Sequence, residues 1–259
     1  MKLWTLLENT SSRDDLQAEH GLSYYLEVNG HKILFDAGQS GAFADNAEVM
    51  GIDLKQVNLC ILSHGHYDHG GGLHRFLRLN DKAPIYLSKR AFSDCHNASD
   101  RYIGLDETLK YSDRLIYTED KTVLDQGLTL YSCNTMEKVV PTEAFGLTVD
   151  GKPDSFLHEQ YLLIEEAGKR ILISGCSHKG IINLVSWFRP DVLIGGFHFM
   201  KLDTMGEDAA KLDAAAKTLL QFPTKYYTGH CTGLAQYDYL RQRMGDRLEY
   251  LSTGQSIEL

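Results

Sequence analysis

The segment with the clearest potential for chemistry carries three imidazoles and one carboxylate within a few residues. It has the pattern His-x-His-x-Asp-His and consists of His64, His66, Asp68 and His69. Neutral imidazoles bind zinc, iron, manganese or cobalt through one ring nitrogen, and a carboxylate adds an anionic ligand. Four ligands on one tight loop do not all reach one tetrahedral ion comfortably, so the spacing favours two neighbouring ions. His64 and His66 would bind one ion. Asp68 and His69 would bind the other.

Four more histidines lie directly beside expected strand ends. His158 precedes a strand, whereas His178, His198 and His230 each follow one. Because α/β sheets bind ligands at the carboxyl ends of their strands, these imidazoles are candidates to join the His-rich segment. A single histidine at such a place is more often packed or hydrogen-bonded, and for His198 packing and a substrate contact are both open. For His20, a position at the rim of the site and a solvated loop position are both open.

The elements that must position these residues follow a similar order in both halves of the chain. Each half has a strand pair followed by alternating strands and helices. The expected strands are Leu22–Val28, Lys32–Phe35, Val57–Leu62, Pro84–Leu87, Leu115–Tyr117, Thr122–Leu124, Leu128–Tyr131, Gln160–Glu165, Arg170–Ser174, Asp191–Ile194, Lys225–Tyr227 and Arg247–Leu251. The expected helices cover residues 41–50, the stretch after the glycines at 70–72 to Leu79, a segment ending near Phe188, 207–221 and 233–244. This order predicts one pseudosymmetric α/β domain over residues 1–259.

Two long segments, 88–113 and 134–155, show no clear periodicity. Long irregular segments in a compact domain often form lids over a site. Aromatic residues in them, such as Tyr102 and Phe145, could contact an aromatic or phosphorylated molecule. Variable surface loops are an equally good interpretation.

The composition disfavours several classes of protein. The 259 residues include 26 Lys and Arg against 35 Asp and Glu, which gives a formal net charge of −9. This balance, without a basic cluster, disfavours nucleic acid or an anionic membrane as a partner. The five cysteines are scattered and odd in number, which does not suggest a disulfide framework. With no apolar leader and no bilayer-length apolar run, we expect a cytoplasmic protein that binds a small-molecule substrate; its oligomeric state stays open.

The sequence resembles the metallo-β-lactamase superfamily in motifs spread over the whole chain. These motifs are Phe35-Asp36-Ala37-Gly38, the segment from His64 to His69, Leu172-Ile173-Ser174-Gly175-Cys176 and Tyr227-Thr228-Gly229-His230. More narrowly, the chain is similar to a branch of metal-dependent hydrolases and dihydropterin ribofuranosyl-aminobenzene phosphate synthase-like proteins. The motifs that suggest this branch are Glu19-His20-Gly21-Leu22-Ser23, His158-Glu159-Gln160, Gly175-Cys176-Ser177-His178, Gly195-Gly196-Phe197-His198 and His230-Cys231-Thr232-Gly233.

The resemblance implies a four-layer αβ/βα sandwich, in which helices flank two mixed β-sheets and the metals lie at the sheet edge. It implies two metal-binding sets, namely His64, His66 and His158, and Asp68, His69 and His230. Cys176 stands where most of the superfamily has a bridging aspartate. Its thiolate could bind one metal, or it could leave ligation to His178. Asp36 would support the loop through hydrogen bonds, or would be a simple turn carboxylate.

The resemblance also implies a metal-dependent hydrolase with two divalent ions. Zinc is the expected metal, and iron or manganese are the alternatives. A metal-bound hydroxide would attack a small-molecule ester or phosphoester, because metal lowers the pKa of bound water to about 7. Asp68, His178 and His198 are the expected catalytic residues. Three alternatives are open: a transferase that forms a pterin precursor, a di-iron oxidoreductase, and a ligand sensor without turnover.

Overall fold

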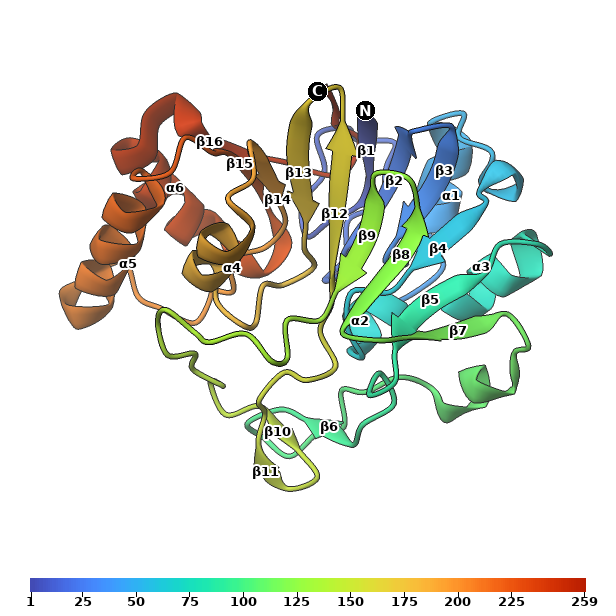
Figure 1. The fold of residues 1–259 in the computed structure, drawn as a ribbon, viewed down its shortest axis with the longest axis horizontal. Coiled ribbons are helices and arrows are strands. Elements are labelled where there is room, and N and C mark those ends of the chain that lie inside the picture. The colour runs from blue at the N-terminus through green and yellow to red at the C-terminus, as the bar shows by residue number, and fades with distance from the viewer.

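Two seven-stranded sheets lie face to face in the computed structural model, which describes residues 1–259 (Figure 1). The first sheet contains β1 (Lys2–Leu7), β2 (Ser23–Val28), β3 (His31–Phe35), β4 (Leu59–Ile61), β5 (Ile85–Ser88), β7 (Leu115–Thr118) and β17 (Ser256–Glu258), in the spatial order β17-β1-β2-β3-β4-β5-β7. The second contains β8 (Lys121–Asp125), β9 (Leu128–Tyr131), β12 (Tyr161–Glu166), β13 (Lys169–Ile173), β14 (Val192–Ile194), β15 (Lys225–Thr228) and β16 (Leu248–Tyr250), in the spatial order β16-β15-β14-β13-β12-β9-β8.

The longer helices lie on the outer sides of the two sheets. The first sheet is accompanied by α1 (Ala42–Val49) and α3 (Leu73–Leu79), and the second by α4 (Ile181–Phe188), α5 (Gly206–Leu219) and α6 (Leu234–Met244). The single-turn helix α2 (Tyr67–Gly70) lies at the edge between the sheets. Short 3-10 turns are η1 (Leu54–Gln56), η2 (Glu107–Tyr111), η3 (His230–Thr232) and η4 (Gly245–Arg247). None of these helices has both the length and the apolar character needed to cross a membrane.

Alternating side chains along the strands build the layers of the molecule. In β12, Leu162 and Ile164 pack between the two sheets, whereas Tyr161 and Leu163 pack on the side of the helices. Because successive side chains of a strand point to opposite faces, one strand serves an inner and an outer apolar layer. Phe43 of α1 belongs to the corresponding outer layer of the first sheet. The result is the four-layer αβ/βα sandwich that the family resemblance implies.

The parallel part of each sheet brings several loops to one edge. β3, β4, β5 and β7 are mutually parallel neighbours, as are β13, β14, β15 and β16. Since the carboxyl ends of parallel neighbours lie at the same edge, the segments that follow β4, β13, β14 and β15 are placed close together. These are the segments that carry the candidate histidines.

The structure differs from the expected elements at three places. The sequence did not predict β1 and β17, which pair at Lys2 and Glu258 near opposite ends of the chain. The helix α2 begins at Tyr67, inside the His-rich segment, where a loop is expected. The two irregular segments also pair with each other, through β6 (Cys95–His96), β10 (Thr148–Val149) and β11 (Lys152–Pro153). The strands β6, β10, β11 and β17 have only two or three residues each, which is too short to produce a periodic signal in the sequence.

Candidate metal centre

Side chains from several loops meet at the shared sheet edge. They are His64 and His66 after β4, Asp68 and His69 in α2, Cys176 and His178 after β13, His198 after β14 and His230 after β15. All of them are buried except His198, which is partly exposed. The chain therefore gathers imidazole, carboxylate and thiol groups in a space from which bulk water is largely excluded.

Four groups of donor atoms lie within 4.8 Å of one another, as the ligands of a cation would. His20, Asp68 and His230 form one group, and His66, Cys95, Asp154 and His158 form another. The other two groups share Cys176 and are called the first and second donor sets. In the first, His64 Nε2 lies 3.3 Å from His178 Nε2, and a donor atom of Cys176 is within 4.8 Å of both. In the second, His69 Nε2 lies 3.1 Å from His230 Nε2 and 3.2 Å from Cys176 Sγ. A tetrahedral zinc ion with bonds of about 2.0–2.1 Å separates its nitrogen ligands by about 3.3 Å. The geometry fits two neighbouring ions that share Cys176.

Asp36 orients two of these histidines. Its Oδ2 accepts hydrogen bonds from His69 Nδ1 and from Ser63 Oγ, both at 2.7 Å. Ser63 Oγ in turn lies 2.8 Å from His64 Nδ1 and can accept its proton. With the Nδ1 protons held in this way, the Nε2 atoms of His64 and His69 face the centre. The structure therefore favours Asp36 as a hydrogen-bonding support of the His-rich segment over a simple turn carboxylate.

Asn9 and Glu8 orient His230 in a comparable way, and the sequence patterns did not identify either residue. Asn9 Oδ1 lies 2.8 Å from His230 Nδ1, and the Glu8 carboxylate accepts the backbone N–H of His230. Glu159 has a similar role beside the first set, because its Oε1 accepts the backbone N–H of His178 at 2.8 Å. Of these three supporting residues, the sequence indicated only Glu159, because it lies in the motif His158-Glu159-Gln160.

Asp68 contacts three histidines through its Oδ2 atom. The distances are 3.2 Å to His20 Nε2, 3.4 Å to His230 Nε2 and 3.8 Å to His69 Nε2. Burial would raise the pKa of Asp68, but its interactions with these histidines hold the pKa well below its usual range. Asp68 is therefore ionised at neutral pH. His20 reaches the site through this contact and remains 42% exposed, which places it at the rim.

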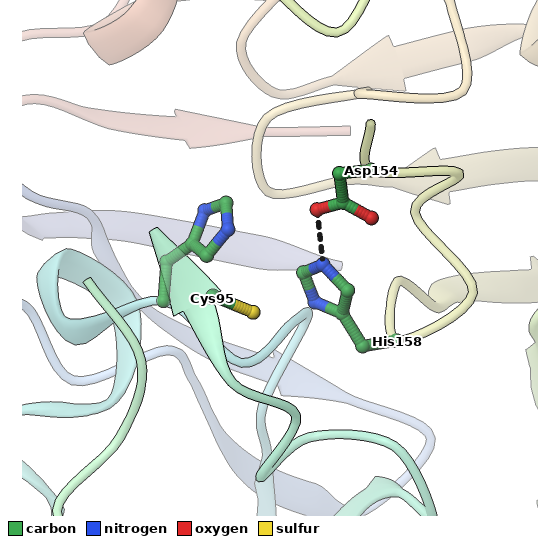
Figure 2. A group of neighbouring side chains, drawn as sticks. Cys95, Asp154 and His158 are labelled. Carbon is green, nitrogen blue, oxygen red and sulfur yellow. Dashed lines mark hydrogen bonds and ion pairs between the residues drawn. The ribbon is translucent and has the colours of Figure 1, made fainter. Parts of the chain in front are cut away.

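His158 does not face the first donor set, in contrast to the arrangement that the resemblance implies. Its Nδ1 accepts the backbone N–H of Gly65 at 3.1 Å, so its proton resides on Nε2, which lies 3.0 Å from Asp154 Oδ2. Figure 2 shows this Asp154–His158 contact beside Cys95. Both ring nitrogens of His158 are therefore engaged. The nitrogen that faces His64 comes from His178 instead.

His66 lies between the first donor set and the group that contains His158. Its ring centroid is 4.6 Å from that of His64 and 5.0 Å from that of His158. A donor atom of His66 also groups with those of Cys95, Asp154 and His158, all within 4.8 Å of one another. Its Nε2 is buried without a hydrogen-bond partner.

The protonation states of the imidazoles suit metal binding. Burial lowers the pKa of His66 to about 3 and the pKa values of His64 and His178 well below the usual value, so these rings are neutral at neutral pH. For His69, burial lowers the pKa, but Asp36 and Asp68 outweigh it and raise the pKa. Metal binding requires an unprotonated nitrogen, and the facing Nε2 atoms of these histidines can supply it, so the residues present fit a pair of divalent cations.

Comparisons with known proteins agree with this architecture. Residues 16–199 match the family model described as the metallo-beta-lactamase superfamily. An uncharacterized protein of Methanocaldococcus jannaschii is 33% identical over 210 residues, which cover 75% of this chain and 78% of that protein. The 7,8-dihydropterin-6-methyl-4-(beta-D-ribofuranosyl)-aminobenzene-5'-phosphate synthase of the same organism is 28% identical over the full chain and 96% of its own length.

The solved structures give the same result. The crystal structure of Tm1679, described as a metal-dependent hydrolase of the beta-lactamase superfamily, superposes with a TM-score of 0.81 at 26% identity, covering 100% of this chain and 99% of Tm1679. The fold, the placement of the donor residues and the family match all agree. The chain belongs to the metallo-β-lactamase superfamily.

Proposed function

We propose that this protein is a metal-dependent hydrolase that cleaves an ester or phosphoester bond of a small molecule. The observation that carries the proposal is the pair of donor sets joined by Cys176, with His64 and His178 in one set and His69 and His230 in the other. The likeness to Tm1679, which is described as a metal-dependent hydrolase, supports it. We assign zinc to both positions because imidazole nitrogen and thiolate sulfur are donors that zinc prefers.

Ions bound by these residues would lower the pKa of bound water to about 7 and polarise the bond under attack. Asp68 is ionised and faces both His69 and His230, so its carboxylate can accept a hydrogen bond from the attacking water and orient it. Burial lowers the pKa of His198 to about 4, so its ring is neutral at neutral pH. Its ring centroid lies 4.2 Å from that of His178, where an N–H group can donate to the substrate.

The test uses the protein purified without added metal and three chromogenic substrates: p-nitrophenyl phosphate, bis(p-nitrophenyl) phosphate and p-nitrophenyl acetate. We expect turnover of at least one substrate, loss of turnover with a chelator, and recovery with zinc. His64→Ala should lower kcat by about 100-fold or more, because it removes a donor of the first set. His74→Ala is the matched control, since His74 pairs with Asp106 outside both sets. Turnover that survives both chelation and His64→Ala would refute the proposal.

A second candidate function is a synthase that forms a pterin precursor. It is favoured by the 28% identity to the Methanocaldococcus jannaschii synthase, which extends over this whole chain. Incubation of the zinc-loaded protein with two substrates, followed by mass spectrometry, separates the two candidates. One substrate is a 7,8-dihydropterin that carries a diphosphate leaving group on its 6-methyl carbon, and the other is a ribofuranosyl-aminobenzene phosphate, so that coupling releases diphosphate. A coupled product supports the synthase. Hydrolysis of the chromogenic esters without a coupled product leaves the hydrolase as the function.

A further inference from the structure

A cavity of about 470 Å³ lies beside the first donor set. Ser177, His178 and His198 line its inner side, and His178 is itself a member of that set. The other walls come from residues 140–145, the start of α4, residues 197–202 and one face of α5. Small-molecule sites usually have volumes of about 300–1,000 Å³, so this cavity has the size of a substrate pocket.

The walls of the cavity are mainly apolar and rich in aromatic rings. Phe145 lies edge-on to His198, with ring centroids 5.5 Å apart and an angle of 66° between the rings. Phe197 and Phe199 have a similar arrangement at 6.0 Å and 79°. Because aromatic rings favour edge-to-face and offset contacts, a planar apolar ring would find partners on more than one wall.

The charges around the cavity are few. Apart from the histidines, Glu143 and Lys211 are the only ionisable side chains that line it. Lys211 Nζ lies 2.9 Å from Asp208 Oδ1 and is therefore already paired. A polyanionic ligand would lose its hydration in this cavity and gain no charged partners there. The lining therefore disfavours a polyanionic occupant.

We propose that this cavity binds an uncharged aromatic portion of the substrate, while the ester or phosphoester group lies at the donor sets. This inference rests on the proposed hydrolase function and gives its substrate class, an aryl ester or aryl phosphoester. Phe145, Phe199 and His198 form the aromatic walls that select the substrate.

A pair of alanines on α5 offers a matched test. Ala214 lines the cavity and is exposed, so Ala214→Leu narrows the cavity without changing the core. Ala210 lies one turn earlier on the same helix, is also exposed and is not part of the lining, so Ala210→Leu is the control. The first readout is the fluorescence of the uncharged probe N-phenyl-1-naphthylamine. We expect saturable binding to the wild type and to Ala210→Leu, and binding about tenfold weaker or more for Ala214→Leu. Equal binding by all three proteins would overturn the assignment of the cavity.

The second readout compares the hydrolysis of 2-naphthyl, phenyl and n-octyl phosphates by the same three proteins. The two aryl leaving groups, 2-naphthol and phenol, have similar acidity, but the naphthyl ring system is larger than the phenyl ring. We expect kcat/KM to favour the naphthyl over the phenyl ester by about tenfold in the wild type and in Ala210→Leu, and this ratio to approach one in Ala214→Leu. A preference for the octyl ester over the naphthyl ester would overturn the aromatic assignment.

The two readouts keep this inference separate from the proposed function. Probe binding that Ala214→Leu abolishes, in a protein that hydrolyses no ester, would reject the hydrolase and retain the aromatic cavity. Hydrolysis with neither probe binding nor a preference between the aryl esters would retain the hydrolase and reject the cavity as its aromatic subsite.

Discussion

Asp36 Oδ2 accepts a hydrogen bond from His69 Nδ1 at 2.7 Å, although the two residues are 33 positions apart in the sequence. Both side chains are fully buried. Asp36 directly follows β3 and has a left-handed conformation, with φ at +60°, and its carboxylate bonds Ser63 in the segment after β4. Because Nδ1 of His69 carries the shared proton, Nε2 is the atom that faces His230 and Cys176. This contact therefore determines which nitrogen of His69 is available to a metal.

Asp36→Ala should weaken the second donor set and destabilise the protein. Loss of an outer hydrogen-bond partner of a metal-binding histidine commonly lowers metal affinity by about 10–100-fold. The backbone N–H and hydroxyl of Ser63 would also lose their acceptor, at a cost of about 2 kcal/mol in the free energy of unfolding. Competition with a chelating dye measures the affinity, and urea denaturation measures the stability. Asp45→Ala is the control, because Asp45 is an exposed partner of Arg75. Wild-type metal affinity in Asp36→Ala would contradict this role.

His178→Asn should lower the zinc content by about one ion per chain, whereas His158→Asn should leave it unchanged. The reason is that His178 Nε2 faces His64, while both ring nitrogens of His158 are engaged by Gly65 and Asp154. An asparagine at 158 retains an acceptor oxygen for the Gly65 N–H. Elemental analysis of the two variants measures the difference. The reverse pattern, with zinc lost from His158→Asn and kept in His178→Asn, would show that His158 is the ligand.

Cys176→Ala should reduce the metal content and remove the absorption band that thiolate ligation produces. Cys176 is the donor that the two sets share, so its loss affects both positions. In cobalt-substituted protein, thiolate ligation produces a charge-transfer absorption in the near ultraviolet, which we expect in the wild type and not in Cys176→Ala. Cys133→Ala is the matched control, since Cys133 is a buried free thiol outside the donor sets. If the absorption persisted in Cys176→Ala, another cysteine would have to supply the sulfur.

The metal-free protein should lose stability as the pH falls below about 6.5. Burial lowers the pKa of His66 to about 3 and that of His198 to about 4, whereas both groups titrate near the ordinary value in the unfolded chain. Between about pH 6.5 and 4 the unfolded chain therefore binds more protons than the folded one, and the free energy of unfolding decreases as pH decreases. Each group contributes up to about 1.4 kcal/mol per pH unit in this window.

Urea denaturation of the metal-free protein at several pH values measures this dependence. His198→Asn should reduce the slope by up to about 1.4 kcal/mol per pH unit, and asparagine tolerates the left-handed backbone at this position. His74→Asn, which changes a surface histidine paired with Asp106, should leave the slope as it is in the wild type. An identical slope in the wild type and in His198→Asn would show that His198 remains accessible to protons.

The order of strands and helices in the sequence predicted one pseudosymmetric α/β domain, the family resemblance implied its two sheets, and the motifs indicated most of the residues that gather at the sheet edge. A strand such as β12 could be predicted because it begins with a short continuous apolar run, Tyr161–Ile164, and such a run is typical of a strand buried on both faces. His64, His66, Asp68 and His69 lie within one short segment, so the local chain brings them together whatever the rest of the fold does. The later histidines could be placed because each lies beside the end of a recognisable strand.

Which donor atoms face one another depends on contacts between segments that are distant in the sequence. Asn9 and His230 are 221 positions apart, and their contact depends on how β1 and β15 are arranged in the packed sheets. His178 rather than His158 faces His64, because the ring nitrogens of His158 contact the Gly65 N–H and Asp154, and no residue pattern contains this information. Residue types and strand ends are local properties of a chain, whereas tautomers and hydrogen-bond partners arise from contacts between distant segments. For that reason the orientation of each candidate donor side chain could not be predicted from the sequence.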